Sequence, residues 1–161
     1  MLNVGIDSYI TVAEADAYIA ANYAEYDDLA VVWGVLSEHD KEAYLRASLG
    51  QIEALVLYGR PYSREQALQF PRRDCFKAGP DIPSEVKEAQ AENALALLNK
   101  DLKARSDEQM KTLGTLGVVK NTKYNKREMG EVGLGATLTG SEKHSSVLES
   151  EDAVKMLKAW Y

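Results

Sequence analysis

Residues 60–73 (RPYSREQALQFPRR) constrain the fold of this chain most, because they form a dense connector between two long stretches with helical spacing. Pro71 disfavours helical backbone at Phe70, so no helix can run through the segment. We expect the side chains of Leu68 and Phe70 to point inward and to pack in the core. The simpler interpretation is an ordinary loop between helices that is anchored by one aromatic residue. Because the segment carries no catalytic chemistry, we favour a role in assembly rather than in reaction.

Thr11 and Glu14 have the spacing of a capping box, in which each side chain bonds the other residue's backbone amide at a helix start. The apolar spacing that follows predicts a helix over residues 12–23. Residues 29–33 form a short apolar piece that periodicity alone does not assign. We interpret it as a loop or a turn of helix that carries Trp33 inward.

Ser37 is a good N-cap for a second helix, because acidic residues follow it in the first turn. We expect this helix to be about 20 residues long, with Gly59 as its C-cap. Ser63 and Gln66 repeat the capping-box spacing and predict one further short turn of helix. The apolar face of the second helix comprises Ala43, Leu45, Ala47, Leu49, Ile52, Leu55 and Val56.

Pro83 stands at a first-turn position and opens a third helical stretch that is rich in alanine. After Arg105 the helical pattern weakens, and repeated glycines among valine, leucine and threonine suit extended or hairpin structure. We therefore predict a helical body over residues 1–105 and an arm, a linker and a C-terminal helix over residues 106–161. The fold class is mainly α: a small helical bundle with an extended β-hairpin-like arm and a short C-terminal helix.

The predicted arm contains two candidate strands, residues 116–120 and 126–132. A two-stranded hairpin alone is marginally stable in water, so this one must dock on the helices or on another subunit. Residues 138–147 read as a flexible linker. The arm is therefore an argument for oligomerisation.

A last short helix is expected to follow Ser150, which is a good N-cap. Its end carries three large apolar or aromatic side chains, whereas chain ends are usually polar. Either these side chains fold back on their own domain, or a partner covers them. We slightly favour the partner, because aromatic residues are enriched at interfaces. The C-terminal docking candidates are Leu157, Trp160 and Tyr161.

The 161-residue chain has a net charge of −6, which argues against coating nucleic acid through its whole surface. No apolar run approaches the roughly 20 residues that span a bilayer, and the first residues lack the features of a signal peptide. We expect assembly in the cytoplasm and no membrane partner. Cys75 is the only cysteine, which excludes an internal disulfide, and the separation of His39 from His144 argues against zinc.

The sequence contains no phosphate-binding glycine loop, nucleophile elbow or zinc-protease motif. Cys75 lies beside several cations, but a nucleophile without a base is weak evidence for catalysis, so we interpret it as a packed or incidental thiol. Acidic pairs such as Asp27 with Asp28 are explained by a solvated surface. We therefore expect no enzyme activity, no cofactor and no bound metal.

A basic strip is the strongest candidate for contact with another molecule. With an aromatic residue inside it, the strip has the character of a track for single-stranded nucleic acid. The same residues could instead meet acidic surfaces of a neighbouring protein or line a channel for duplex DNA, which we favour because four charges alone give a small affinity. The strip comprises Lys120, Lys123, Tyr124, Lys126 and Arg127.

Two short motifs, in the same order along the chain, carry a resemblance to a known family. The N-terminal motif comprises Tyr9, Ala13, Glu14, Ala15 and Tyr18, and the connector motif comprises Gln66, Ala67, Leu68, Phe70, Pro71 and Arg72. Over roughly residues 4–100 the chain resembles the head–tail adaptor (head-completion, connector) proteins of tailed bacteriophages. Many members of that family carry the label of a DnaT-like single-stranded-DNA-binding protein, which implies a different function.

The resemblance implies a structural protein of the virion neck that assembles as a dodecameric ring beneath the portal. The ring would extend the channel through which double-stranded DNA passes and would offer a docking platform for tail or neck proteins. It also implies that both motifs define the fold, with Arg72 as a possible subunit contact, and it supplies no catalytic residues. The alternative function is single-stranded-DNA binding of the replication type.

Overall fold

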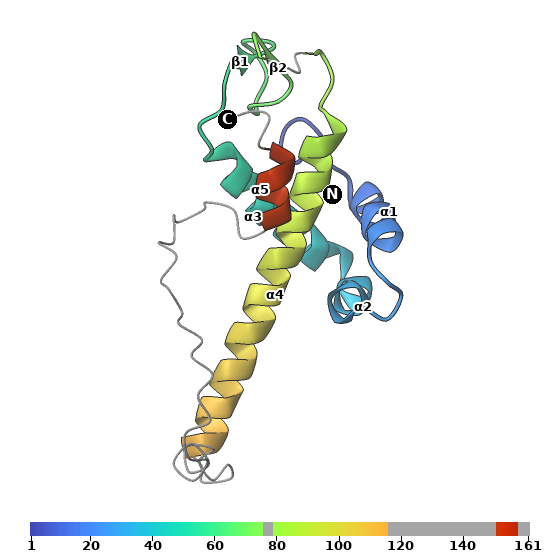
Figure 1. Cartoon of the computed structure of the whole chain (residues 1–161), viewed down its shortest axis with the longest axis vertical. Coiled ribbons are helices and arrows are strands. Elements are labelled where there is room, and N and C mark those ends of the chain that lie inside the picture. Colours follow the sequence, from blue (N-terminus) through green and yellow to red (C-terminus); the bar gives the residue numbers. More distant parts are fainter. Residues whose placement is uncertain (76–78, 116–150, 158–161) are drawn as a thin grey trace, which may run out of the picture. The chain divides into compact units, whose positions relative to one another are not determined.

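The computed structural model describes residues 1–75, 79–115 and 151–157, and it is mainly helical (Figure 1). Its elements are α1 (Val12–Asn22), α2 (Asp28–Val35), α3 (Glu38–Glu53), β1 (Arg60–Pro61), β2 (Arg72–Arg73), α4 (Ser84–Thr115) and α5 (Glu151–Leu157). The predicted fold class is confirmed: a helical protein with a small antiparallel strand pair and a short C-terminal helix. The chain divides into two compact units between Asn99 and Lys100, and α5 belongs to the first unit.

Helices α1 and α2 begin where local side chains cap them. The Thr11 hydroxyl accepts from the Glu14 amide at 3.1 Å, and the Glu14 carboxylate accepts from the Thr11 amide at 2.9 Å, so the predicted capping box is present. Asp27 caps α2 by accepting from two backbone amides of its first turn. Residues 29–33, which the apolar spacing did not assign, therefore belong to a helix, and Trp33 is buried as expected.

Helix α3 begins after Ser37, whose hydroxyl accepts from the Asp40 amide at 3.1 Å. It ends at Glu53, earlier than the expected C-cap at Gly59, and Val56 beyond it is 90% exposed rather than part of the apolar face. Gly59 has a positive φ of 77° for a different reason: a Cβ there would lie 2.4 Å from the carbonyl oxygen of Arg73. Only glycine permits this close approach of the connector's two sides.

The connector forms a short antiparallel pair, in which Arg60 lies opposite Arg73 and Pro61 lies opposite Arg72. The Ser63 amide donates to the Gln66 side chain at 2.9 Å, but no helix follows. The predicted helical turn is therefore wrong. Beyond the capping contact, the Gln66 amide group donates to two carbonyls further along the connector, at 2.6 and 2.9 Å, and so closes a loop instead of starting a helix.

The core forms where α3, α4, α5 and the connector meet. Leu68 and Phe70 are buried in it, as predicted. Helix α4 starts just after Pro83 and continues through Arg105 to Thr115, so residues 106–115 are helical where the glycine pattern favours extended structure. The core cluster comprises Tyr9, Leu49, Ile52, Leu55, Leu57, Leu68, Phe70, Val86, Ala89, Ala153 and Leu157.

Helix α5 supplies Ala153 and Leu157 to this core, and both are fully buried. For Leu157 the fold-back alternative therefore holds, because the side chain already packs within its own chain and is not available to a partner. Trp160 and Tyr161 lie outside the described residues, as do the candidate strands, the linker and the basic strip of Lys120, Lys123, Tyr124, Lys126 and Arg127. Within the described ranges, none of the helices combines the length and apolar character needed to span a membrane.

Candidate interaction surfaces

Tyr9 and Glu53 join the N-terminal motif to the connector motif. The Tyr9 hydroxyl donates to the Glu53 carboxylate and accepts from the Phe70 amide at 3.2 Å. The other oxygen of Glu53 accepts from the Gln69 amide at 3.1 Å, and the Gln69 side chain donates to the Glu53 carbonyl at 2.6 Å. Burial, followed by the bond to Glu53, raises the pKa of Tyr9, so the phenol keeps its proton.

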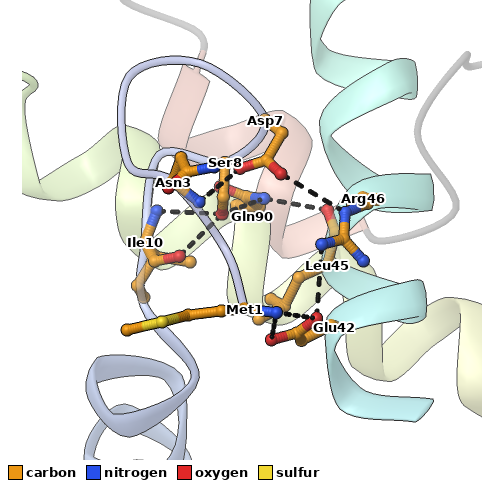
Figure 2. A network of polar contacts seen from close by, with 9 residues as sticks. All are labelled: Met1, Asn3, Asp7, Ser8, Ile10, Glu42, Leu45, Arg46 and Gln90. Atoms are coloured by element: carbon orange, nitrogen blue, oxygen red, sulfur yellow. Dashed lines mark hydrogen bonds and ion pairs between the residues drawn. The ribbon is translucent and has the colours of Figure 1, made fainter. Parts of the chain in front are cut away.

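Gln90 on α4 anchors the segment before α1 (Figure 2). Its fully buried side chain accepts from the Tyr9 amide at 2.9 Å and donates to the Ser8 hydroxyl at 3.0 Å and the Leu45 carbonyl at 2.8 Å. Every polar atom of the Gln90 side chain is thus paired, which is the condition for burying an amide at low cost. The two motifs and helices α3 and α4 are therefore held in one arrangement.

Arg72 is an internal residue of the connector. Its guanidinium donates to the carbonyls of Tyr58 at 2.8 Å, Leu57 at 2.9 Å and Gly59 at 2.9 Å, and it lies 5.9 Å from the centroid of the Phe70 ring. One rigid fork thus donates to three backbone carbonyls. Because the side chain is buried and used within the chain, it is not free to make the expected subunit contact.

An acidic cleft lies between α1 and α2 and encloses a cavity of about 460 Å³. Its floor contains Asp16, whose carboxylate accepts from the Trp33 indole at 2.7 Å and from the Lys41 ammonium at 3.0 Å. Glu25 is at its edge, and Asp28 opens α2; both are exposed and neither makes an ion pair within the described ranges. The other lining residues are Ile19, Ala20, Tyr23, Ala24, Ala30 and Gly34.

Three exposed apolar or aromatic side chains lie on or next to α2. Tyr26 is 88% exposed and Val35 is 79% exposed, and Val31 is also exposed. None of the three lines the cleft, but Val31 and Val35 lie one turn apart on the same side of α2 and form a short apolar strip there. We call this surface, with the cleft, the α2 surface: Tyr26, Val31 and Val35 together with Glu25 and Asp28.

The connector presents a second surface of opposite charge. A cavity of about 240 Å³ is lined by Arg60, Pro61, Ser63, Arg64, Gln66 and Arg73. Asp74 pairs with Arg60, and this bond lowers the pKa of the Asp74 carboxyl below its usual range. The nearby charge of Arg73 adds a smaller effect in the same direction. Arg64 and Arg73 make no ion pair with any carboxylate that the structure describes.

Two further observations mark this connector surface. The buried Nε of Arg73 has no hydrogen-bond partner among the described residues, which is uncommon for a buried donor. Val56, Tyr58 and Tyr62 are exposed on the same segment, so guanidinium groups and aromatic rings alternate along it. We define the connector surface as Val56, Tyr58, Tyr62, Arg60, Arg64 and Arg73.

Sequence reasoning found the connector but did not identify this surface. The signal was available, because Tyr58, Arg60, Tyr62 and Arg64 alternate at every second position. Of the sequence-based candidates, Gln66, Leu68, Phe70, Pro71 and Arg72 are brought together inside the connector, where they hold the fold. Among residues 1–75, 79–115 and 151–157, no cluster of His, Cys, Asp or Glu side chains is arranged to hold a metal ion, and Cys75 packs partly buried against the core.

Fold and surfaces together define a class: a small helical protein whose described features are a tightly hydrogen-bonded core and two contact surfaces. The chain belongs to the family described as "Putative DnaT-like ssDNA binding protein", whose model matches residues 2–157. Neither the curated proteins nor the solved structures contain a match to the chain.

Proposed function

We propose that this protein is a structural head–tail adaptor of a tailed bacteriophage. In this proposal it forms a ring, with twelve copies as the expected number, below the portal. The ring extends the DNA channel and provides the docking platform for tail or neck proteins, so its partners are further copies of itself, the portal, the tail side and duplex DNA in passage. The resemblance of the two sequence motifs supplies this role.

The observation that carries the proposal is that the elements bearing the two contact surfaces, α2 and the β1–β2 connector, lie at opposite ends of α3 (Figure 1). The α2 surface comes just before the first residue of α3, and the connector surface comes just after its last residue. Sixteen helical residues extend roughly 24 Å, so the two surfaces of one molecule cannot cover each other. Each is available to a different neighbour.

Unlike surfaces at two ends of one chain produce head-to-tail contacts, and such contacts close into rings when the rotation between copies allows it. Their opposite charges favour contact between different ends over contact between like ends. This is the geometry that a ring-forming adaptor needs.

Single-stranded-DNA binding is the second candidate, and two observations favour it. The family description names that activity, and the alternation of tyrosine and arginine from Tyr58 to Arg64 has the composition of a track on which bases stack and phosphates are neutralised. This candidate would use the connector surface alone.

Light scattering of the purified protein, with and without the portal protein of the same phage, tests the adaptor. We expect a species with the mass of a ring, either in the free protein or only on the portal. A monomer that ignores the portal yet binds a single-stranded oligonucleotide would overturn the adaptor in favour of the second candidate. Fluorescence anisotropy across a salt series measures that binding, because phosphate contacts weaken steeply with salt.

A further inference from the structure

We propose that the connector surface of one copy docks on the α2 surface of the next copy, and that Arg64 and Arg73 bind the carboxylates of Glu25 and Asp28 there. This inference rests on the ring of the proposed function and names the two faces that form it. The occupant of the α1–α2 cleft is thus a second copy of this chain.

The basic face offers donors that lack an acidic partner among the described residues. Arg64 is exposed and Arg73 is half-buried, and neither guanidinium makes an ion pair with a carboxylate that the structure describes. Both line the same cavity of about 240 Å³, which admits a carboxylate group. Guanidinium and carboxylate match in shape as well as charge, because two parallel N–H donors meet two oxygens.

The acidic face offers acceptors that likewise lack an ion-pair partner among the described residues. Glu25 and Asp28 are exposed and make no ion pair within the described ranges. Asp27 is excluded as the main acceptor, because its carboxylate already caps α2. At one end of α3, two carboxylates have no ion pair among the described residues, and at the other end two guanidinium groups are in the same state.

Apolar groups accompany the charges on both faces. The cleft between α1 and α2, about 460 Å³, is lined mainly by alanine, isoleucine and aromatic side chains. On the connector, Tyr58 is 71% exposed and stands beside the arginines in sequence. A tyrosine ring is the common anchor of protein interfaces, where it fills a pocket that charged residues surround.

These observations favour a protein over a nucleic acid as the occupant. Neutralising two phosphates of a single strand changes log K by only about 1.4 per tenfold change in salt, which is a weak electrostatic contribution. Strongly exposed valines, Val56 and Val35, gain nothing from a phosphate backbone but are covered when the two surfaces meet. Moreover, every copy of the chain carries the complementary acidic surface, so the concentration of this binding partner always equals that of the connector surface.

Reversing the charges tests the pairing. Arg64→Glu and Glu25→Arg should each weaken self-association by about tenfold or more, because like charges then face each other at every contact. The double variant R64E/E25R restores the opposite charges and should return association to within about threefold of the unsubstituted protein. Sedimentation velocity across a concentration series, in the free protein and on the portal, measures association.

Arg105→Glu is the matched control, since it makes the same charge change at an exposed position of α4 outside both surfaces. It should associate like the unsubstituted protein. Neither Arg64 nor Glu25 makes a side-chain hydrogen bond or ion pair with any residue that the structure describes, so both variants should fold, and circular dichroism checks this.

If a ring forms and the single reversals leave it unchanged, this interface is wrong while the adaptor proposal stands. If self-association depends on the pairing but the assemblies ignore the portal, the interface stands and the adaptor proposal fails. The inference is overturned if the unsubstituted protein stays a monomer at every concentration and binds a single-stranded oligonucleotide that R64E does not bind. That result would assign the connector surface to nucleic acid.

Discussion

The hydroxyl of Tyr9 accepts a hydrogen bond at 3.2 Å from the backbone amide of Phe70, which lies 61 residues further along the chain, and the two rings meet edge to face with centroids 5.7 Å apart. The same hydroxyl donates to Glu53 at the end of α3. One phenol thus joins the segment before α1, the end of α3 and the connector. The junction therefore holds Phe70 of the connector against the end of α3.

Replacing Tyr9 by phenylalanine should destabilise the protein by about 1–3 kcal/mol, because it leaves the Phe70 amide and the Glu53 carboxylate with one partner fewer in a buried site. Urea denaturation followed by circular dichroism measures the change. Tyr62→Phe is the control: Tyr62 is partly exposed, and its hydroxyl makes no hydrogen bond in the described structure, so we expect a change within about 0.5 kcal/mol. Equal effects of the two substitutions would contradict the proposed junction.

Gln90→Met should be more costly, about 2–4 kcal/mol, although the side chains are similar in volume. The substitution leaves the buried Tyr9 amide without its acceptor and removes the side-chain donor to the Leu45 carbonyl. Thermal and urea unfolding measure the loss. Gln109→Met, at an exposed position of the same helix, should leave stability almost unchanged, and a comparable loss there would show that the buried network is not the cause.

Arg72→Lys should loosen the connector while the helices remain folded. Lysine keeps the charge but cannot donate at once to the carbonyls of Leu57, Tyr58 and Gly59, which the arginine fork holds. Hydrogen exchange read by mass spectrometry should rise in the peptide over residues 56–64 and not in α1. Arg64→Lys, on the exposed side of the connector, should leave exchange unchanged. Uniform exchange in the Arg72 variant would show that the fork does not order the connector.

Glu14 should make stability depend on pH in the acid range. The Lys87 ammonium at 2.7 Å, and then the Thr11 amide, lower the pKa of Glu14 from its ordinary 4.5 to about 2. A carboxyl whose pKa is lower in the folded state stabilises the fold above its unfolded pKa, and this contribution is lost as pH falls toward the folded pKa. The difference in melting temperature between the unsubstituted protein and Glu14→Gln should therefore shrink from pH 5 to pH 2.

Because the Glu14 side chain is 45% exposed, water screens its ion pair, and we expect the difference at neutral pH to be small, about 1 kcal/mol or less. Glu108→Gln, at an exposed position of α4, is the control and should show no such convergence. A difference that stays constant with pH would mean that the carboxylate of Glu14 does not stabilise the fold.

The helix starts could be predicted because they depend on residues three positions apart. The capping box at Thr11, the cap at Ser37 and the entry after Pro83 involve bonds that close within one turn, so the sequence alone displays them. The burial of Leu68 and Phe70 could be predicted from their side chains, because removing large apolar side chains from water is favourable. The same local reasoning fails at Ser63, where the capping contact forms but the Gln66 side chain is drawn to more distant carbonyls.

By itself, the sequence determined the helical class, the beginnings of α1 and α3, the entry to α4, and the connector as the point where helical structure stops. Only the tertiary structure decided where α3 ends, that Arg72 is internal and that Leu157 enters the core. It also decided that acids and arginines without an ion pair in the described part of the chain lie at opposite ends of α3. The physical reason is range. Caps and turns close between near neighbours, whereas the burial of Arg72 and Leu157 and the junction of Tyr9, Glu53 and Phe70 join segments tens of residues apart, whose meeting no local pattern records.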